Sequence, residues 1–383
     1  MVAKDGRRMP GVVTLHQDSE TQSKPNYFRG HFWGAIGLLI GTMAEPFCLP
    51  LSLRLHQGFT HLRQPDNAEK NPETSATRLV QMALDFAVDR GQRCTLVLDA
   101  YFAVAAVFKL ADAVWSVACQ APLVTILVRA KKSYTAYFPA ERPEHPGPGR
   151  PRKYGDKVKL YEVFDHRHLF ECAPCQVYGA LEEVSYLALN LLWKPTGGFI
   201  RFIFALTSHG PIVLMSGDLE MPAVTAIELY CLRVRVETLF SMLKHLIGAF
   251  CYHFWSKRLP RHSRKAKKNQ HLKQPAKEDV SQVQSCWACC ERFAMLAAIA
   301  LGLLQLMALK FSPQVWGCFQ TFLRTRSRQI PSERTVKDVV GRLVLEDFLN
   351  VAPSATMQEI RDRFLADEKG LSDSSSPTEK EAA

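Results

Sequence analysis

Hydrophobic residues recur along this chain at two spacings, and the change from one to the other predicts its elements. The apolar segments Tyr27–Ile40 and Phe47–Leu55, joined by a turn containing Gly and Pro, predict a β-hairpin. Helical spacing of apolar residues predicts a helix over Ser75–Arg90, with Gly91 as its C-terminal cap. The short apolar run Cys94–Leu98 is typical of a buried central strand.

A β-rich block lies beyond this strand and its terminal Asp99. Helical spacing over Phe102–Trp115 comes first, and the pattern then becomes β-like from Leu123 to Met215, with turn signals between the segments. The predicted strands of the block are Val124–Val128, Tyr134–Phe138, Val158–Phe164, Val184–Leu192, Phe199–Thr207 and Ile212–Met215. This run of strands predicts a β-rich insertion between two helical parts of the chain.

Helices are predicted for most of the remainder. Ala223–Ile247 and Cys290–Phe311 are long candidates, and shorter helices are predicted around Val336–Phe348 and Met357–Leu365. The stretch Lys257–Lys277 is strongly basic and contains almost nothing apolar, so we predict a solvated loop there.

These elements predict an α/β fold with a mixed sheet flanked by helices, interrupted by the β-rich insertion and followed by a helical C-terminal region. The two parts of the core are predicted at 1–120 and 217–312, with the basic loop 257–277 inside the second. The remaining divisions are the insertion at 121–216, the C-terminal helices at 313–366 and a polar, Ser-rich tail at 367–383 that is expected to be disordered.

Composition narrows the choice of partner. The 383 residues carry a net charge of +11, which favours a polyanion, either nucleic acid or an anionic membrane. The N-terminal residues have no apolar run behind them, so we predict no cleavable signal and expect the 11 cysteines to be reduced thiols in a cytoplasm. The C-x2-C pairs Cys172/Cys175 and Cys286/Cys289 are too far apart in sequence to favour a compact zinc site.

The most informative local pattern is Y-x2-R-x3-E-x6-K, formed by Tyr230, Arg233, Glu237 and Lys244. On a helix that advances about 100° per residue, these side chains fall within roughly 60° of one another, beside an apolar stripe. In this arrangement the glutamate can bind a metal ion, the two cations can neutralise phosphate and the phenol can donate a hydrogen bond. An ordinary amphipathic helix with solvated charges is the alternative interpretation.

Asp99 is the second candidate for chemistry. A carboxylate at the end of a central strand projects from the sheet edge where ligands of α/β folds gather. A second carboxylate from a distant helix, such as Glu237, can complete a site for Mg²⁺ or Mn²⁺, because hard divalent cations prefer oxygen ligands. Two such ions about 4 Å apart can activate an attacking oxygen and stabilise the leaving oxygen of a phosphodiester.

The segment LVLDAYF around Asp99 and the four-residue pattern together resemble an insertion-sequence transposase of the DDE type, with a ribonuclease H-like catalytic core. The resemblance covers residues 1–310, and all four fixed positions of the helix signature match. It implies that Asp99 and Glu237 are the second and third acids of a site that binds two Mg²⁺ or Mn²⁺ ions for DNA nicking and strand transfer. It also implies that Tyr230, Arg233 and Lys244 hold the transposon end, in a nucleoid-associated bacterial protein that forms a homodimer in a synaptic complex.

The first acid of the family has no clear counterpart here. The family places it on the first strand of the core, whereas Asp5 and Asp18 lie in polar surroundings and end no apolar strand. Asp218 follows a short apolar strand, but it comes after Asp99 and suits a lead into the Glu237 helix. The chain therefore resembles a truncated copy without its first strand, and we expect it to be inactive. A non-catalytic DNA-binding remnant of the same fold is the alternative.

Two basic segments outside the signature are candidate DNA contacts. Arg150 and Arg152 resemble a short Gly-Arg-Pro hook that lies in narrow minor grooves, with a plain basic loop as the alternative. The loop 257–277 is predicted to bind phosphates without reading sequence. Its candidate residues are Arg264, Lys265, Lys267 and Lys268.

A basic membrane-associated protein is the hypothesis from another functional class. The segment Phe293–Leu309 carries no charged residue and lies at the lower edge of the length that spans a bilayer. Its Ala and Gly content also suits a buried helix, so we favour DNA over membrane as the partner.

Overall fold

The computed structural model describes residues 1–4, 6–16, 26–55, 74–141, 149, 151–266, 273, 275–320 and 328–350, the last four of them by backbone only. The chain divides into two compact units, Met1–Gly302 and Leu303–Ala383. With 38% of residues helical and 32% in strands, it has the mixed α/β composition that the pattern predicts.

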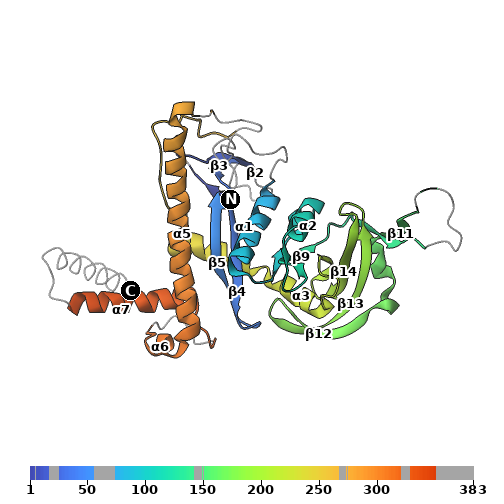
Figure 1. Ribbon diagram of the computed structural model, residues 1–383. Helices are drawn as coiled ribbons and strands as arrows, with labels where there is room; N and C mark the ends of the chain where they lie inside the picture. Colours follow the sequence, from blue (N-terminus) through green and yellow to red (C-terminus); the bar gives the residue numbers. More distant parts are fainter. Residues whose placement is uncertain are drawn as a thin grey trace, which may run out of the picture. The chain divides into compact units, whose positions relative to one another are not determined.

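The first unit is built around an eight-stranded mixed sheet (Figure 1). Its strands are β6 (Cys94–Leu98), β9 (Val124–Arg129), β10 (Thr135–Pro139), β11 (Tyr154–Lys159), β12 (Glu171–Val177), β13 (Ala180–Trp193), β14 (Gly198–Thr207) and β15 (Gly210–Ser216). Their order is β11-β10-β13-β14-β15-β9-β6, and β12 pairs with β13 off this path. β6 and β9 are parallel, whereas the other pairs are antiparallel.

Helices and short turns connect these strands. The α-helices are α1 (Ser75–Arg90), α2 (Ala105–Asp112), α3 (Ala223–Leu232), α4 (Arg235–Ser241) and α5 (Val280–Lys310), the last of which continues into the second unit. A π-helical turn, η5 (Met242–Ile247), follows α4. The 3-10 helices are η2 (Ala100–Phe102), η3 (Leu160–Asp165), η4 (Arg167–Leu169) and η6 (Lys277–Asp279), and β7 (Trp115–Ser116) pairs with β8 (Ala121–Pro122).

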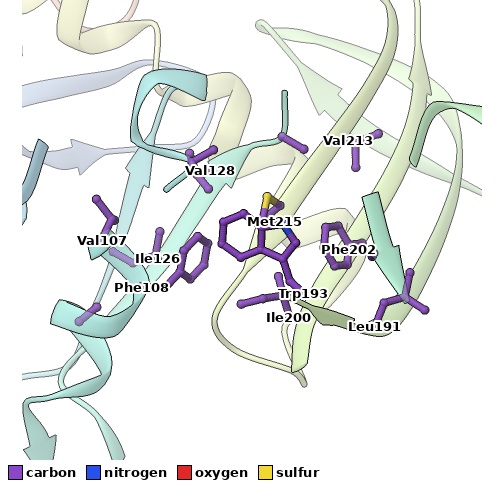
Figure 2. Packing of buried hydrophobic residues seen from close by; sticks show 14 of the residues in the cluster. Val107, Phe108, Ile126, Val128, Leu191, Trp193, Ile200, Phe202, Val213 and Met215 are labelled. Carbon is purple, nitrogen blue, oxygen red and sulfur yellow. The ribbon is translucent and has the colours of Figure 1, made fainter. Parts of the chain in front are cut away.

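Strand alternation gives the sheet two buried faces. Ile126 and Val128 of β9 pack in one apolar cluster with Phe108 of α2 and Phe202 of β14 (Figure 2). Leu127, between them, belongs to a second cluster that contains the buried residues of α3. Because successive strand side chains point to opposite faces, α1 and α2 cover one face and α3 covers the other. Burial on both faces explains the nearly continuous apolar sequence of β9.

The sheet differs from the pattern-based prediction at three places. β6 is an edge strand rather than a central one, because among the described strands only β9 pairs with it. The predicted strand Val158–Phe164 is wrong, since β11 ends at Lys159 and the chain then forms η3. β12 escapes the prediction because Pro174 interrupts its pattern, and a strand that pairs on one side only tolerates proline.

The N-terminal segments form two further sheets. β1 (Val2–Ala3), β3 (Tyr27–His31) and β2 (Val13–His16) make a three-stranded sheet in that order. β4 (Trp33–Gly41) and β5 (Pro46–Leu55) form the predicted hairpin. The first predicted segment of the hairpin is thus divided, because its beginning pairs with β1 and β2 rather than with β5.

The predicted helix α1 has both of its predicted ends. Thr74 and Thr77 form a capping box at its N-terminus, and Gly91 caps the C-terminus with a φ of 63°. Glycine adopts this left-handed conformation without the steric cost that a Cβ would bring. α2 begins later than predicted, since Asp99 accepts a hydrogen bond from the Tyr101 N–H and caps η2 ahead of it, and it ends earlier, since Trp115 belongs to β7.

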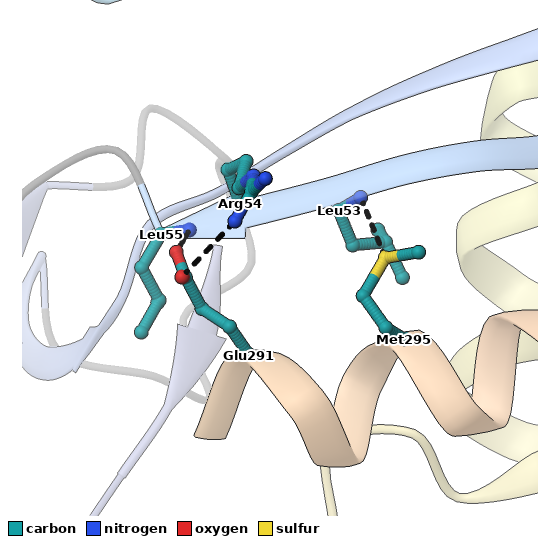
Figure 3. A network of polar contacts seen from close by, with 5 residues as sticks. All are labelled: Leu53, Arg54, Leu55, Glu291 and Met295. Carbon is teal, nitrogen blue, oxygen red and sulfur yellow. Dashed lines mark hydrogen bonds and ion pairs between the residues drawn. The ribbon is translucent and has the colours of Figure 1, made fainter. Parts of the chain in front are cut away.

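Side chains of α5 accept hydrogen bonds from backbone N–H groups on the outer edge of the β4–β5 hairpin (Figure 3). The N–H of Leu55 donates to Glu291 Oε1 at 2.9 Å, and the N–H of Leu53 donates to Met295 Sδ at 3.2 Å. Arg54 also forms an ion pair with Glu291 at 3.6 Å. Unpaired backbone donors at a buried edge cost stability, so these contacts fix α5 against β5.

The second unit contains the end of α5, α6 (Ser312–Gly317) and α7 (Glu333–Asn350). Within it, Gln305 donates to Glu333 at 3.1 Å, and Arg342 donates to the carbonyl of Cys318 at 2.7 Å. α7 confirms the helix predicted around 336–348. The helix predicted at 357–365 and the tail 367–383 lie outside the described residues.

Candidate nucleic-acid interface

Asp99 and Arg129 lie at the same edge of the main sheet. Leu98 and Val128 are the last residues that pair between the parallel strands β6 and β9. Asp99 follows Leu98 and Arg129 follows Val128. Asp99 is half-buried and its Oδ1 accepts from the Tyr101 N–H at 2.9 Å. Its other carboxylate oxygen makes no hydrogen bond to a described residue and remains for a ligand. The carboxyl edge of parallel strands is where ligands of α/β sheets usually bind.

The helix that carries the signature is broken rather than continuous, which corrects the prediction for 223–247. α3 ends at Leu232, and the turn to α4 contains hydrogen bonds of three-residue spacing from Arg233 N–H to the Tyr230 carbonyl and from Glu237 N–H to the Val234 carbonyl. The β-branched Val234 lowers helix propensity at this point. Further on, η5 widens the helix by its π-helical hydrogen bonding before Gly248 ends it.

This break changes how the signature residues are presented. Tyr230 is buried, with 6% of its surface exposed, instead of lying on a polar face. Glu237 keeps 65% of its side chain exposed, and Lys244 is also exposed. The prediction of one common polar face, which assumed a regular 100° step, is therefore wrong for Tyr230.

Three members of the signature nevertheless meet. The Arg233 guanidinium lies 5.9 Å from the centre of the Tyr230 ring, and its Nη2 atom is 3.4 Å from Glu237 Oε1. Burial raises the pKa of the Tyr230 hydroxyl, and the neighbouring cations of Arg233 and Arg129 act against this rise.

Lys244 lies in a different environment from the other three. The pKa of the Met1 amino group is lowered, first by burial and then by the positive charge of Lys244. The fourth signature position therefore lies within electrostatic range of the N-terminal amino group, and its role in binding DNA stays a prediction.

Asp218 forms part of the turn that leads into α3. Its Oδ1 accepts from the Glu220 N–H at 3.0 Å, and its own N–H donates to Ser216 Oγ at 3.0 Å. These local bonds fit the expectation that Asp218 precedes and positions the helix.

The described part of the chain contains no group of three or more His, Cys, Asp or Glu side chains placed to hold a metal ion. Asp99 and Glu237 remain the two assigned carboxylates, and their sharing of an ion stays a prediction. Asp5 and Asp18 lie outside the described residues.

The basic segments are only partly described. Arg152 is exposed just before β11, and Arg264 and Lys265 are exposed in the basic loop. Arg150, Lys267 and Lys268 lie outside the described residues. Just ahead of this loop, Trp255 is 59% exposed and available for stacking on a base.

Two side chains of this region, Arg129 and Tyr178, are absent from the sequence-based assignment, and the charge of Arg129 acts to lower the pKa of both the Tyr178 and the Tyr230 hydroxyl. Arg129 ends the apolar run of β9, a signal equivalent to Asp99 at the end of β6, whereas no local pattern points to Tyr178. Neither a model of a known protein family nor a curated protein sequence matches this chain.

Proposed function

We propose that this chain is a DNA-transposition polypeptide of the DDE transposase type, with a ribonuclease H-like arrangement of its core. The observation that carries the proposal is the position of Arg129. It is the last residue of β9, the strand that pairs with β6, and its positive charge opposes the rise that burial causes in the pKa of Tyr230. Asp99 and Arg129 thus lie at the carboxyl ends of two paired strands, and in the proposal the Tyr230–Arg233–Glu237 group of the signature completes the site there.

The donor chemistry of Asp99 and Glu237 suits a hard divalent cation. Asp99 offers a carboxylate oxygen that makes no hydrogen bond to the residues that the structure describes, and Glu237 has an exposed side chain. Carboxylate oxygens are the ligands that Mg²⁺ and Mn²⁺ prefer. When bound, such an ion supplies charge stabilisation at the oxygens of a phosphodiester. In the proposal Arg233 orients Glu237, while Tyr230 and the exposed cations hold the DNA backbone.

The two-ion chemistry of this family uses three carboxylates, and only two are assigned in this chain. We therefore propose that the chain binds DNA while its nicking and strand-transfer activity is weak or lost. The alternative is a DNA-binding remnant of the same fold without metal chemistry. A measurement of metal binding distinguishes the two. Location at the nucleoid in a bacterial cytoplasm and a homodimeric synaptic complex belong to the proposal as well.

The test combines DNA binding with metal binding. A labelled duplex titrated with the protein at several salt concentrations should show a linear fall of log affinity with log salt. Calorimetric titration with Mn²⁺ should show binding that Asp99→Asn and Glu237→Gln each weaken, while Asp218→Asn serves as the matched acidic control. Equal Mn²⁺ binding by all four proteins would remove the metal site, and salt-independent DNA binding would remove the proposed function.

One observation favours a second candidate function at a membrane. The helix over Lys277–Lys310 is long and apolar enough to cross a bilayer, and Leu296, Ile299 and Leu303 on it are 67%, 56% and 55% exposed. Buried core helices pass the same length test, so the exposed side chains are the relevant point. Flotation with anionic vesicles tests this function, because a protein that stays at the bottom of the gradient without detergent does not use this helix as an anchor.

A further inference from the structure

We propose that the outer end of the main sheet binds an unpaired strand of DNA through a row of aromatic and basic side chains. This surface, the outer patch, consists of Tyr137, Tyr154, Lys157, Lys194 and Phe199 on strands β10, β11 and β14 and just after β13. It lies at the end of the strand order opposite to β6. The choice of DNA as the ligand rests on the function proposed above, whereas the surface is separate from the site proposed there.

Strand register places the side chains of the outer patch in one row across the sheet. Lys157 of β11 pairs with Tyr137 of β10. Tyr137 also pairs with Leu192 of β13, which pairs in turn with Phe199 of β14. Residues at paired positions of antiparallel strands lie on the same face of the sheet. Neighbouring strands are about 4.8 Å apart, so a row across four strands extends about 14 Å.

The row lies on a part of the sheet that no helix covers among the described residues. Leu191, Trp193 and Ile200 alternate with the residues of the row and lie in the cluster beneath α1 and α2 (Figure 2). On the face of the row, the cluster around α3 reaches Ile203 of β14 and leaves Phe199 outside it. Phe199 accordingly keeps 43% of its surface exposed, which makes its ring available to a ligand.

Two tyrosine rings hold the ammonium group of Lys194 in place. Its Nζ atom lies 4.0 Å from the centre of the Tyr137 ring and 5.3 Å from that of Tyr154. The two rings contact each other at 5.5 Å between centroids, with 66° between their planes. Attraction between a cation and aromatic rings positions the charge without neutralising it. Lys194 is therefore a fixed positive charge beside the exposed ring of Phe199.

The lysines of the outer patch have no acidic partner in the part of the chain that the structure describes. Lys157 and Lys194 are both exposed, and neither forms an ion pair there. Unpaired cations of this kind attract the phosphates of a nucleic acid without reading its sequence.

The acidic side chains nearby do not remove this charge. Asp156 precedes Lys157 in β11, so strand alternation places it on the opposite face. Glu162 is paired with Lys159 at 2.5 Å. Glu141 follows β10, and its charge is offset by the exposed Lys153 just before β11. The outer patch therefore keeps a positive charge.

An unpaired DNA strand fits this combination of an exposed ring and free cations. The bases of a single strand are available to stack on an aromatic side chain such as Phe199, whereas the bases of a duplex stack on one another. The phosphates of the same strand can then contact Lys157 and Lys194. An acidic peptide would supply negative charge but no succession of flat bases.

The test measures binding of the full chain to a labelled oligothymidylate of about 16 nucleotides by fluorescence anisotropy across a salt series. Phe199→Ala should weaken binding at least about fivefold, because the stacking of one base is lost. Lys194→Gln should reduce the slope of log affinity against log salt by about 0.7, the value for one phosphate of a single strand. The matched controls are Trp115→Ala, which removes a ring that is 58% exposed, and Lys109→Gln, which removes an exposed cation of α2.

A second variant at the same position separates stacking from a folding defect. Phe199→Tyr keeps a ring that can stack and should bind as tightly as the wild type. Weak binding by Phe199→Tyr as well as by Phe199→Ala would overturn the stacking role. Polyglutamate that displaces the oligonucleotide as readily as unlabelled oligothymidylate would show a site for acidic chains and overturn the assignment of DNA.

The outcomes also distinguish the outer patch from the proposed function. Salt-dependent binding of a duplex without binding of oligothymidylate would overturn the patch and leave the proposed function standing. Binding of oligothymidylate that Phe199→Ala and Lys194→Gln leave unchanged would overturn the patch as well. Binding of oligothymidylate that these variants weaken, without any binding of a duplex, would support the patch and remove the proposed function.

Discussion

Arg233 Nη2 lies 3.4 Å from Glu237 Oε1, one turn further along the chain, across a junction between two helices. The pair keeps a cation beside the acid that we assign to metal binding. Because the Glu237 side chain is 65% exposed, water screens the attraction and the pair adds at most about 1 kcal/mol to stability. The pair therefore orients the two side chains more than it stabilises the fold.

Arg233→Gln is expected to weaken DNA binding without loss of the fold. The variant removes a guanidinium from the phenol and from Glu237, so the salt slope should fall by about 0.9 while the free energy of unfolding changes by less than about 1 kcal/mol. Anisotropy and urea denaturation measure the two quantities. Lys159→Gln removes a comparable exposed pair with Glu162 on η3 and should leave DNA binding unchanged. A large loss of stability in Arg233→Gln would show a structural role instead.

The basic loop should contribute to affinity but not to sequence preference. Replacing Arg264, Lys265, Lys267 and Lys268 by glutamine should reduce the slope of log affinity against log salt. The reduction should be up to about 0.9 for each residue, because the DNA keeps a counterion at each phosphate that is no longer contacted. Competition between duplexes of different sequence should give the same ranking before and after the change. An unchanged slope would show that the loop does not contact phosphate.

We expect no robust Mg²⁺- or Mn²⁺-dependent nicking of plasmid DNA by this chain. Two carboxylates hold one ion weakly, and each 1.36 kcal/mol of lost transition-state stabilisation costs about tenfold in rate. A supercoiled-plasmid assay measures nicking directly. Strong activity that disappears in Asp5→Asn or Asp18→Asn would show that one of these residues is the missing acid, and the assignment of two acids would then be wrong.

Stability should fall below neutral pH because of His31. Its Nε2 donates to the Pro10 carbonyl at 2.8 Å, so its Nδ1 accepts from the Tyr252 hydroxyl at 2.5 Å, and Trp33 donates to that same oxygen at 3.2 Å. A proton on Nδ1 would break this network. Burial, together with the charge of Lys4, lowers the pKa of His31 to about 4, although the bond to Pro10 acts in the other direction.

The sign of this pH effect follows from comparison with the unfolded chain. An unfolded histidine has a pKa near 6.5, so between about pH 6.5 and 4 the unfolded state binds more protons and the folded state loses stability as pH falls. The full loss is about 3 kcal/mol. Urea denaturation at pH 7 and pH 5 should show this dependence in the wild type and a flatter one in His31→Asn. The exposed His168→Gln should behave as the wild type, and a wild-type profile in His31→Asn would contradict the assignment.

The sequence correctly predicts those helices and strands whose ends are set by neighbouring residues. Helix α1 has the predicted bounds because they are set by residues close in sequence, namely Gly91 and the apolar residues at helical spacing before it. The β4–β5 hairpin likewise depends on a short turn between two apolar runs. Asp99 is correctly placed at a strand end for the same reason.

Tertiary arrangement accounts for the differences. An apolar run such as Cys94–Leu98 indicates burial of its faces but says nothing about which edges are paired, so β6 was predicted to be central. Periodicity in the signature cannot reveal a helix junction at Arg233 or a π-helical turn. Arg129 and Tyr230 are far apart in sequence, and no local spacing predicts that the charge of Arg129 affects the pKa of the Tyr230 hydroxyl.

The position of β6 at the end of the main sheet has a consequence for the purified protein. Its sequence, Cys-Thr-Leu-Val-Leu, has no charge and no proline, the devices by which edge strands avoid pairing with other chains. Concentrated solutions should therefore form intermolecular β-structure that begins at this strand, and thioflavin fluorescence should rise with protein concentration. A lysine in place of Thr95, which is exposed, should delay this self-association and increase the soluble yield.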